Sequence, residues 1–265
     1  MRNLTLVVCL ISVFSGSISG CGSAGASSTE NVTMQGGQWE YVVTPENGGI
    51  TMYFGTNLPM TSADFNANNT VIFQPSQIGA TQNIAPVVCS TYALSGAIDG
   101  TKIDGKFDTP TAAFASFSGQ LSSNGQVISN GKYSGQACAV SSTANVKGTL
   151  TGYTVAPISG TYTGKLTSNS FGADVMTIAF TQNPDFTVNI TGTSVENGVT
   201  TSFTNMTGTE SSFIVGGTVL FGANTVNVNG KSQFSGMGHL NVSGTQLLLQ
   251  IDGPNDSAVG TLTKQ

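Results

Sequence analysis

Charged side chains are scarce in this sequence, and arginine is almost absent. Only 8% of the 265 residues are charged, and the single arginine is Arg2. Without residues 1–20, seven lysines face thirteen acids, a balance of 7 − 13 = −6. A nucleic-acid partner requires a basic face that neutralises phosphates, so this class of partner is excluded. Because arginine also makes most bidentate contacts to phosphate and carboxylate, we expect a neutral, apolar or protein partner.

Histidine is equally rare, which removes the usual participants in acid–base and zinc chemistry. His239 is the only one, and its Gly-Met-Gly-His-Leu setting predicts a turn or a strand edge. The chain has no Gly-x-Ser-x-Gly nucleophile motif, no glycine-rich phosphate loop and no dinucleotide fingerprint. We therefore assign no catalytic, metal-binding or cofactor-binding residue, and we expect no cofactor.

The densest group of acids is Asp99, Asp104 and Asp108, with two lysines between them. A calcium loop needs oxygen ligands at alternate positions before a glycine, and this spacing does not provide them. The segment is therefore interpreted as two Asp-Gly turns with solvated charges. Thirteen acids still allow a carboxylate pair for glycoside hydrolysis, although no spacing selects the pair.

The N-terminus carries the features of an export signal. Residues 1–20 hold a basic start, an apolar run from Leu4 to Phe14 and then small residues, which is typical of a signal peptide. The run is shorter than the roughly 20 apolar residues that a membrane-spanning helix needs, and no later stretch reaches that length. We expect residues 1–20 to be removed.

The cleavage region Ile18-Ser19-Gly20-Cys21 resembles the lipobox of bacterial lipoproteins. This resemblance implies that Cys21 becomes the lipidated N-terminus and anchors the protein to a membrane. Gly22 stands where that family often has an aspartate that retains the protein in the inner membrane. The implied location is the bacterial cell envelope, at the periplasmic or surface face of the outer membrane. The alternative is an ordinary secretory peptide in which Cys21 has no role.

Four cysteines are consistent with export. Cys9 leaves with the signal peptide and Cys21 takes the lipid, so Cys89 and Cys138 remain. In an oxidising compartment such a pair forms a disulfide, here closing a loop of about 50 residues and stabilising the fold by roughly 4 kcal/mol. The alternative is two buried free thiols.

The rest of the chain predicts an all-β protein. Its 34 glycines accompany segments of strict apolar–polar alternation, such as Phe186 to Thr191, which is the pattern of a half-buried strand. At most a short helix is expected near residues 61–66 or 111–115. Asn-Gly and Asp-Gly pairs favour the tight turns that join antiparallel strands. Eight such pairs predict an antiparallel meander; they begin at Asn47, Asp99, Asp104, Asn124, Asn130, Asn197, Asn229 and Asp252.

Weak internal repeats indicate two related modules. Gly37-Gln38-Trp39 is echoed by Gly160-Thr161-Tyr162. Two further segments are echoed in the same order: residues 131–135 by 230–236, and residues 148–151 by 260–263. We therefore predict a flexible tether over residues 21–36 and two barrel- or sandwich-like modules over residues 37–156 and 157–265. The alternative is one larger barrel or sandwich.

The triplet Gly37-Gln38-Trp39 resembles the Gly-x-Trp motif that opens lipocalins and related calycin barrels. This resemblance implies a barrel that Trp39 closes at one end, with a pocket for a small apolar ligand beside it. The packing arginine of that family has no counterpart here. The alternative reading of Trp39 is a core aromatic without a ligand.

These observations favour a membrane-anchored envelope lipoprotein that binds or assembles and does not catalyse. Its partner is either a small neutral or apolar ligand inside a barrel, or an envelope protein or polymer on a strand surface. The alternative is a carboxylate-based hydrolase of envelope glycans. A filled interior would favour the surface partner, and a cleft with two carboxyls about 5 to 10 Å apart would favour the hydrolase.

Overall fold

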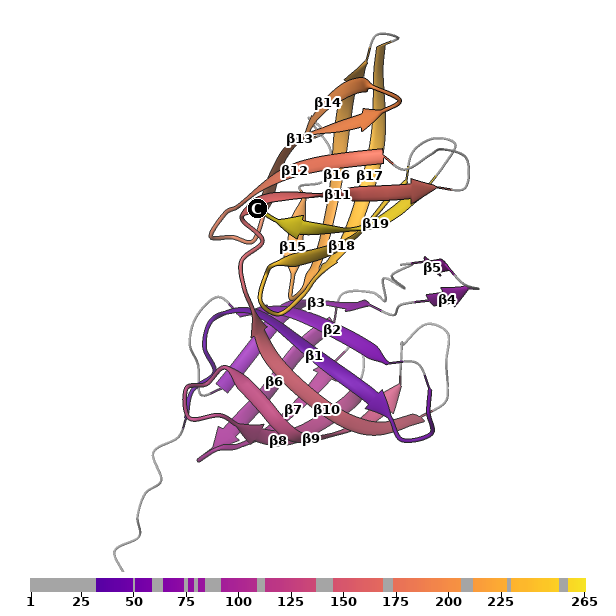
Figure 1. Ribbon diagram of the computed structural model, residues 1–265. Helices are drawn as coiled ribbons and strands as arrows, with labels where there is room; N and C mark the ends of the chain where they lie inside the picture. The colour runs from indigo at the N-terminus through magenta and orange to yellow at the C-terminus, as the bar shows by residue number, and fades with distance from the viewer. Residues whose placement is uncertain are drawn as a thin grey trace, which may run out of the picture.

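The computed structural model shows an all-β protein built of two modules (Figure 1). It describes residues 32–49, 51–58, 64–73, 76–78, 81–83, 92–108, 113–136, 145–168, 174–205, 212–227, 230–252 and 257–265. These residues contain strands and turns but no helix, and so no helix that could cross a membrane. The predicted fold class is confirmed. The described parts of the two segments considered for a short helix, 64–66 and 113–115, lie in strands.

The first module is a closed antiparallel barrel of eight strands. Each strand pairs with the next along the chain, and the last pairs back onto the first, with Trp39 opposite Thr154. A small hairpin, β4 (Ser76–Ile78) and β5 (Thr81–Asn83), is inserted after β3. The barrel strands are β1 (Gly37–Pro45), β2 (Met52–Leu58), β3 (Asp64–Phe73), β6 (Tyr92–Asp99), β7 (Lys102–Asp108), β8 (Ala113–Leu121), β9 (Val127–Gln136) and β10 (Asn145–Val155).

The second module is a nine-stranded antiparallel sheet that curls on itself. Its first strand pairs with its last, and an additional pairing of β14 with β16 connects the two ends of the sheet. The strands are β11 (Gly160–Ser168), β12 (Asp174–Gln182), β13 (Val188–Glu196), β14 (Val199–Asn205), β15 (Phe213–Val215), β16 (Thr218–Asn227), β17 (Gly230–Leu240), β18 (Gln246–Asp252) and β19 (Ser257–Lys264).

Each module has a hydrophobic core of its own. In the barrel, the inward side of β1 places Trp39 and Tyr41 in the interior, where Phe54, Phe107 and Phe117 pack around Tyr41. An eight-stranded barrel is just wide enough for side chains to fill its interior. In the second module, alternate residues of β12 point inward, as the sequence pattern predicts: Met176, Ile178 and Phe180 are buried.

Several of the predicted turns occur where two strands meet. The pairs beginning at Asn47, Asp99, Asn124 and Asn197 connect consecutive strands. Asn197 and Gly198 have φ angles of 48° and 79°, the left-handed geometry that a two-residue hairpin turn requires. The pairs at Asn229 and Asp252 lie partly outside the described residues.

Two predicted turns are wrong, because the dipeptide lies inside a strand. Asp104-Gly105 is in the middle of β7, where the ring of Phe117 occupies the space that a Cβ on Gly105 would need. Asn130-Gly131 is in β9, and its left-handed Asn130 (φ 51°) lies where the register of β9 shifts against both neighbours. The same backbone preference that makes a turn therefore makes a β-bulge here.

The predicted tether is too long, because residues 32–36 lie against the barrel. The Val32 amide donates to the Gly100 carbonyl and the Gln35 amide to the Gly125 carbonyl, both at 3.0 Å. Met34 is fully buried in the barrel core. The sequence did not predict this contact, because Met34 lies in a mostly polar segment and belongs to no extended apolar–polar pattern.

The internal repeats fall on equivalent strands at two of three places. Gly37 and Gly160 begin the first strand of each module with φ angles of 125° and 134°, and Trp39 and Tyr162 follow at the same spacing. Residues 148–151 and 260–263 lie in the last strands, β10 and β19. The middle repeat does not match, since β9 is next to last in its module and β17 is followed by two strands.

Candidate functional site

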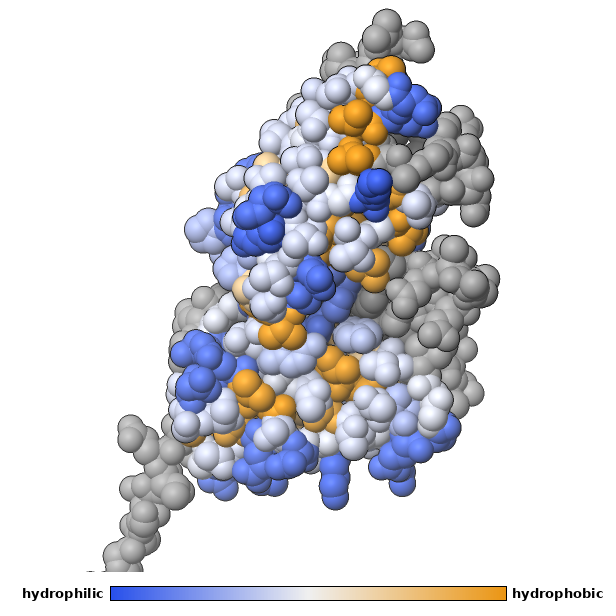
Figure 2. Space-filling view, viewed as in Figure 1, coloured by the Kyte–Doolittle hydropathy of each residue, from blue (hydrophilic) through white to orange (hydrophobic). Residues whose placement is uncertain are grey.

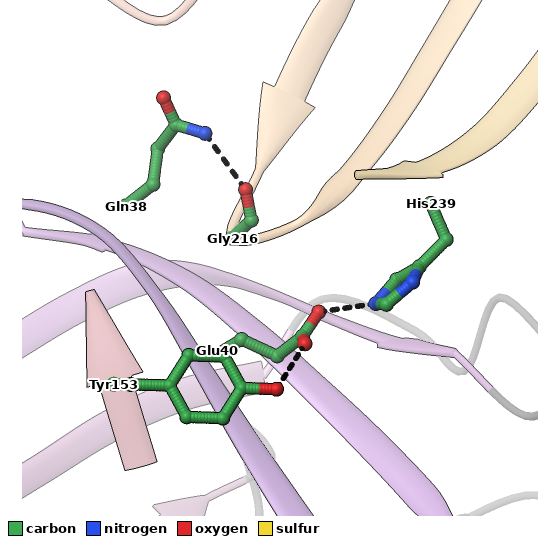
Figure 3. A network of polar contacts seen from close by, with 5 residues as sticks. All are labelled: Gln38, Glu40, Tyr153, Gly216 and His239. Atoms are coloured by element: carbon green, nitrogen blue, oxygen red, sulfur yellow. Dashed lines mark hydrogen bonds and ion pairs between the residues drawn. The ribbon is translucent and has the colours of Figure 1, made fainter. Parts of the chain in front are cut away.

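The two modules meet where the turn between β15 and β16 contacts β1 and β2. Gln38 Nε2 donates to the Gly216 carbonyl at 2.8 Å. Asn57 Nδ2 donates to the Ile214 carbonyl at 2.7 Å, and the Gly216 amide donates to Asn57 Oδ1 at 3.1 Å. Only four residues, 156–159, separate β10 from β11. These hydrogen bonds give the junction a defined geometry, and Figure 3 shows the one from Gln38 to Gly216.

The contact also depends on small residues. A Cβ on Gly55 would overlap the Val215 carbonyl oxygen, and a Cβ on Gly216 would approach the Trp39 carbonyl oxygen. Gly216 also has a φ of 57°, which other residues adopt at a cost. The backbones of the two modules therefore lie in direct contact at this point.

A charged network lies beside this contact. Glu40 Oε2 lies 2.6 Å from His239 Nε2 of the second module, and the Tyr153 hydroxyl donates to Glu40 Oε1 at 2.8 Å (Figure 3). Glu40 is only 1% exposed, and it is the one charged residue among the buried side chains that the structure describes. A buried carboxylate is tolerated only when it is paired and hydrogen-bonded, as it is here.

Strand alternation explains how Glu40 reaches this position. Trp39 and Tyr41 point into the barrel, so Gln38 and Glu40 lie on its outward face. Both are nevertheless buried, with 3% and 1% exposure, because the second module covers them. Polar outward residues have thus become the contacts between modules.

Burial and the charge of Glu40 raise the pKa of two tyrosines. Burial raises the pKa of Tyr153, and the negative Glu40 and the hydrogen bond to it raise this pKa further. Burial and then Glu40 also raise the pKa of Tyr53, whose ring lies 5.0 Å from the His239 ring. Both effects keep the tyrosines neutral and available as donors.

His239 is not in a turn; it is the residue before the last one of β17. It lies in β17 between Thr218 of β16 and Leu248 of β18. The sequence could not reveal its role, because its partner Glu40 is 199 residues away. The two glycines that precede His239 reflect close packing within the sheet, where a Cβ on Gly236 would meet the Phe221 ring and a Cβ on Gly238 would meet Leu247.

The outer face of the barrel carries a hollow of about 410 Å³ over strands β7 to β10. Its floor contains Ser116, Ser118 and Ser134, and Lys132 and Lys147 stand beside them. Register places Ser116 opposite Ser134, Ser134 opposite Lys147 and Ser118 opposite Lys132, so serines and lysines lie next to one another across neighbouring strands. Glu46 and Asp104 complete the charged lining.

The acidic segment that was considered for calcium belongs to this face. Lys102 pairs with Asp104 at 2.6 Å and Lys106 with Asp108 at 3.4 Å, both along the exposed side of β7. The charges are solvated as predicted, but the turn predicted at Asp104-Gly105 does not form, because both residues lie in β7. Within the described part of the chain, no three His, Cys, Asp or Glu residues gather in a group that could hold a metal ion.

Trp39, the candidate for a ligand pocket, is fully buried in the barrel core. Its ring stacks on Tyr41 with centroids 6.1 Å apart, and its indole nitrogen donates to the Gln35 carbonyl at 2.8 Å. These contacts favour the core interpretation. Cys21, Cys89 and Cys138 lie outside the described residues, so lipidation and the disulfide stay predictions.

Comparisons with known proteins place the chain in no family. No family model matches it, and no curated protein matches it. Among solved structures it is similar to the isotype 1 transferrin binding protein B of serogroup B Neisseria meningitidis, with 12% identity, a TM-score of 0.30, and coverage of 89% of this chain and 75% of the other. A mutant of the transferrin binding protein B of Haemophilus parasuis gives 12% identity, a TM-score of 0.27, and coverage of 89% and 77%. At these TM-scores the similarity carries no information on function, which depends on the contacts within this chain.

Proposed function

We propose that this chain is a lipoprotein of the bacterial cell envelope that is anchored through Cys21 and binds an envelope protein or polymer on its outer surface without catalysis. The observation that carries this proposal is the filled barrel interior. Trp39, Tyr41, Phe54 and Phe107 are each 0% exposed and pack against one another. A small apolar ligand would have to displace these rings, so the surface is the better place for a partner.

The hollow over β7 to β10 is a candidate contact site on that surface. It combines hydroxyl groups with lysines of which Lys132 and Lys147 have no carboxylate within 4.0 Å among the described residues. On the face drawn in Figure 2, hydrophobic residues form only small separate patches. The hollow and the face drawn in Figure 2 therefore suit a polar partner better than an apolar one.

The contacts of the carboxylates support a role without catalysis. Glu40 is buried and is engaged by Tyr153 and His239. Asp104 and Asp108 are engaged by lysines of their own strand. A glycosidase needs two carboxyls facing one substrate site. Glu40 and Asp108 do not line the hollow, and Asp104, which lines it together with Glu46, is paired with Lys102.

Site-specific photo-cross-linking tests the proposal. The full chain is expressed in a bacterial host with a photoreactive amino acid at Ser134, in the hollow, or at Val195, on the exposed face of the second module. We expect a discrete adduct from Ser134 that weakens when Lys132 and Lys147 are both changed to Ser, and none from Val195. Equal adducts from both positions, or turnover of an envelope glycan that a single Asp→Asn change abolishes, would overturn the proposal.

A further inference from the structure

The lysines of the barrel are gathered on one side of it. All four are exposed, and they lie on strands β7, β9 and β10: Lys102, Lys106, Lys132 and Lys147. The other five barrel strands contain no lysine. The total charge of the chain, which predicts a neutral, apolar or protein partner, averages over all surfaces and does not show this grouping. The fold gives an acidic protein one face that is rich in cations, so an anionic partner suits that face.

The hollow lies on this face, and strand register arranges its side chains in two rows across the sheet. The first row has a lysine at each end and serines between them: Lys106, Ser116, Ser134 and Lys147. The second row contains Asp104, Ser118, Lys132 and Thr149. Residues opposite each other in neighbouring strands point to the same side of the sheet, so each of these lysines stands beside a serine. Because the cations are spread along the rows and do not converge, they suit a partner with repeated negative charges.

We propose that the hollow binds an acidic polysaccharide. This inference rests on the proposed function, which places a protein or polymer on the same surface. Lys132 and Lys147 have no carboxylate within 4.0 Å among the described residues, so each ammonium group is available to a carboxylate or phosphate of the polymer. The serine hydroxyls of the floor can both donate to and accept from sugar hydroxyls.

The remaining lining residues favour a sugar chain over a protein. The two aromatic residues beneath the hollow, Phe117 and Tyr133, are 4% and 2% exposed, so neither ring can anchor a partner. Protein interfaces usually draw most of their affinity from exposed aromatic or arginine anchors, which this lining lacks.

The two carboxylates of the lining are compatible with an acidic sugar chain. Asp104 is neutralised by Lys102 at 2.6 Å. Glu46 can accept hydrogen bonds from sugar hydroxyls, whereas it would repel a chain of phosphates that has no hydroxyl donors. The hollow therefore combines groups for the charges and for the hydroxyls of the same polymer.

Biolayer interferometry tests the inference on the full processed chain in detergent. The probes are immobilised alginate, a polymer of uronic acids, dextran, a neutral polymer of glucose, and polyphosphate, which carries charge without sugar. We expect alginate to bind at least about tenfold more tightly than dextran and more tightly than polyphosphate, because charge-assisted contacts add to those of the hydroxyls. The alginate affinity should fall as the salt concentration rises, since exposed charges are screened.

Three variants locate the binding. Lys132→Ser combined with Lys147→Ser should lower the alginate affinity on the order of tenfold or more. Lys165→Ser combined with Lys231→Ser removes the same charge from the second module and is the matched control, which should keep the native affinity. Ser134→Leu fills the floor of the hollow without a change of charge, and it should also weaken alginate binding on the order of tenfold.

Equal losses in the two lysine double variants, or native affinity in Ser134→Leu, would overturn the inference, because binding would then follow charge alone. Polyphosphate binding as tight as that of alginate, or no binding of alginate, would overturn it as well. The photo-cross-linking experiment at Ser134 separates this outcome from failure of the proposed function. A protein adduct there without alginate binding removes the polysaccharide and leaves the proposed function standing, whereas the absence of any adduct removes both.

Discussion

Gly55 of the barrel and Gly216 of the second module touch through their backbones: a Cβ added to Gly216 would lie 2.6 Å from the Gly55 Cα. No side chain larger than hydrogen fits between them without moving one module. The junction thus combines close backbone contact with the hydrogen bonds of Gln38 and Asn57.

Gly55→Ala should therefore weaken the junction. The added methyl would meet the Val215 carbonyl, and overpacking of this kind costs about 1 to 3 kcal/mol. Urea unfolding should show the loss, together with faster hydrogen exchange at Gly216. Gly48→Ala is the control for exchange: its φ of 74° makes the variant less stable in urea, but its Cβ would meet no atom within 4 Å, so exchange at Gly216 should not change. Equal exchange in the two variants would contradict the expected contact.

Alkaline unfolding should involve Tyr162. Burial raises its pKa to about 12, above its ordinary value of 10.0, so the folded state holds the phenolic proton more tightly than the unfolded chain. Its contribution to stability is therefore complete below pH 10 and is lost as the pH rises toward 12. Tyr162→Phe should flatten this part of the profile of unfolding free energy against pH.

At neutral pH, Tyr162→Phe should also cost about 1 kcal/mol, because the hydroxyl donates to the Gly244 carbonyl at 2.8 Å. Thermal melting at pH 7 and pH 11 separates the two effects. An unchanged alkaline slope in the variant would show that Tyr162 does not contribute to it.

A disulfide between Cys89 and Cys138 remains a prediction of the sequence, and it implies a cross-linked peptide in a non-reducing map of exported protein. Reduction should lower the free energy of unfolding by about 4 kcal/mol, because the loop between these cysteines is long. A double Cys→Ser variant serves as the control and should not respond to reductant. Alkylation of both thiols without reductant would contradict the pairing.

Lipidation of Cys21 predicts a mature protein that lacks residues 1–20 and carries acyl mass. Intact-mass analysis of protein extracted from membranes of a bacterial host measures both features. Cys21→Ser should leave the protein without acyl mass and outside the membrane fraction. A native species of unmodified mass, released in soluble form, would show that Cys21 is not an anchor.

The fold was predictable because it depends on patterns within single strands. Met176, Ile178 and Phe180 alternate with polar residues, and the structure buries all three. The turn predicted from the Asn197-Gly198 pair is also present, with the positive φ angles that such a turn requires. The turn prediction was wrong at Asn130-Gly131. A tight turn and a β-bulge both require a positive φ, and only the pairing with neighbouring strands distinguishes them.

The junction was not predictable, because its residues look like surface residues in their own strands. Glu40 alternates with Trp39 and Tyr41 as any outward residue would, and only the second module makes it buried. His239 likewise gives no local sign of a partner that is far away in sequence. Contacts of this kind depend on tertiary placement, which strand periodicity does not encode.

The docking of residues 32–36 on the barrel also determines how far the protein reaches from a membrane. Val32 is the first residue of the described chain and is already bonded to Gly100. On the proposal that Cys21 carries lipid, the leader between the anchor and Val32 is residues 21–31, or 31 − 20 = 11 residues. A fully extended chain spans at most about 3.3 to 3.6 Å per residue, so this leader reaches about 40 Å. If the proposed anchor is present, Val32 and the Gly100 turn to which it is bonded therefore stay within about 40 Å of the lipid surface, a distance similar to the thickness of the bilayer.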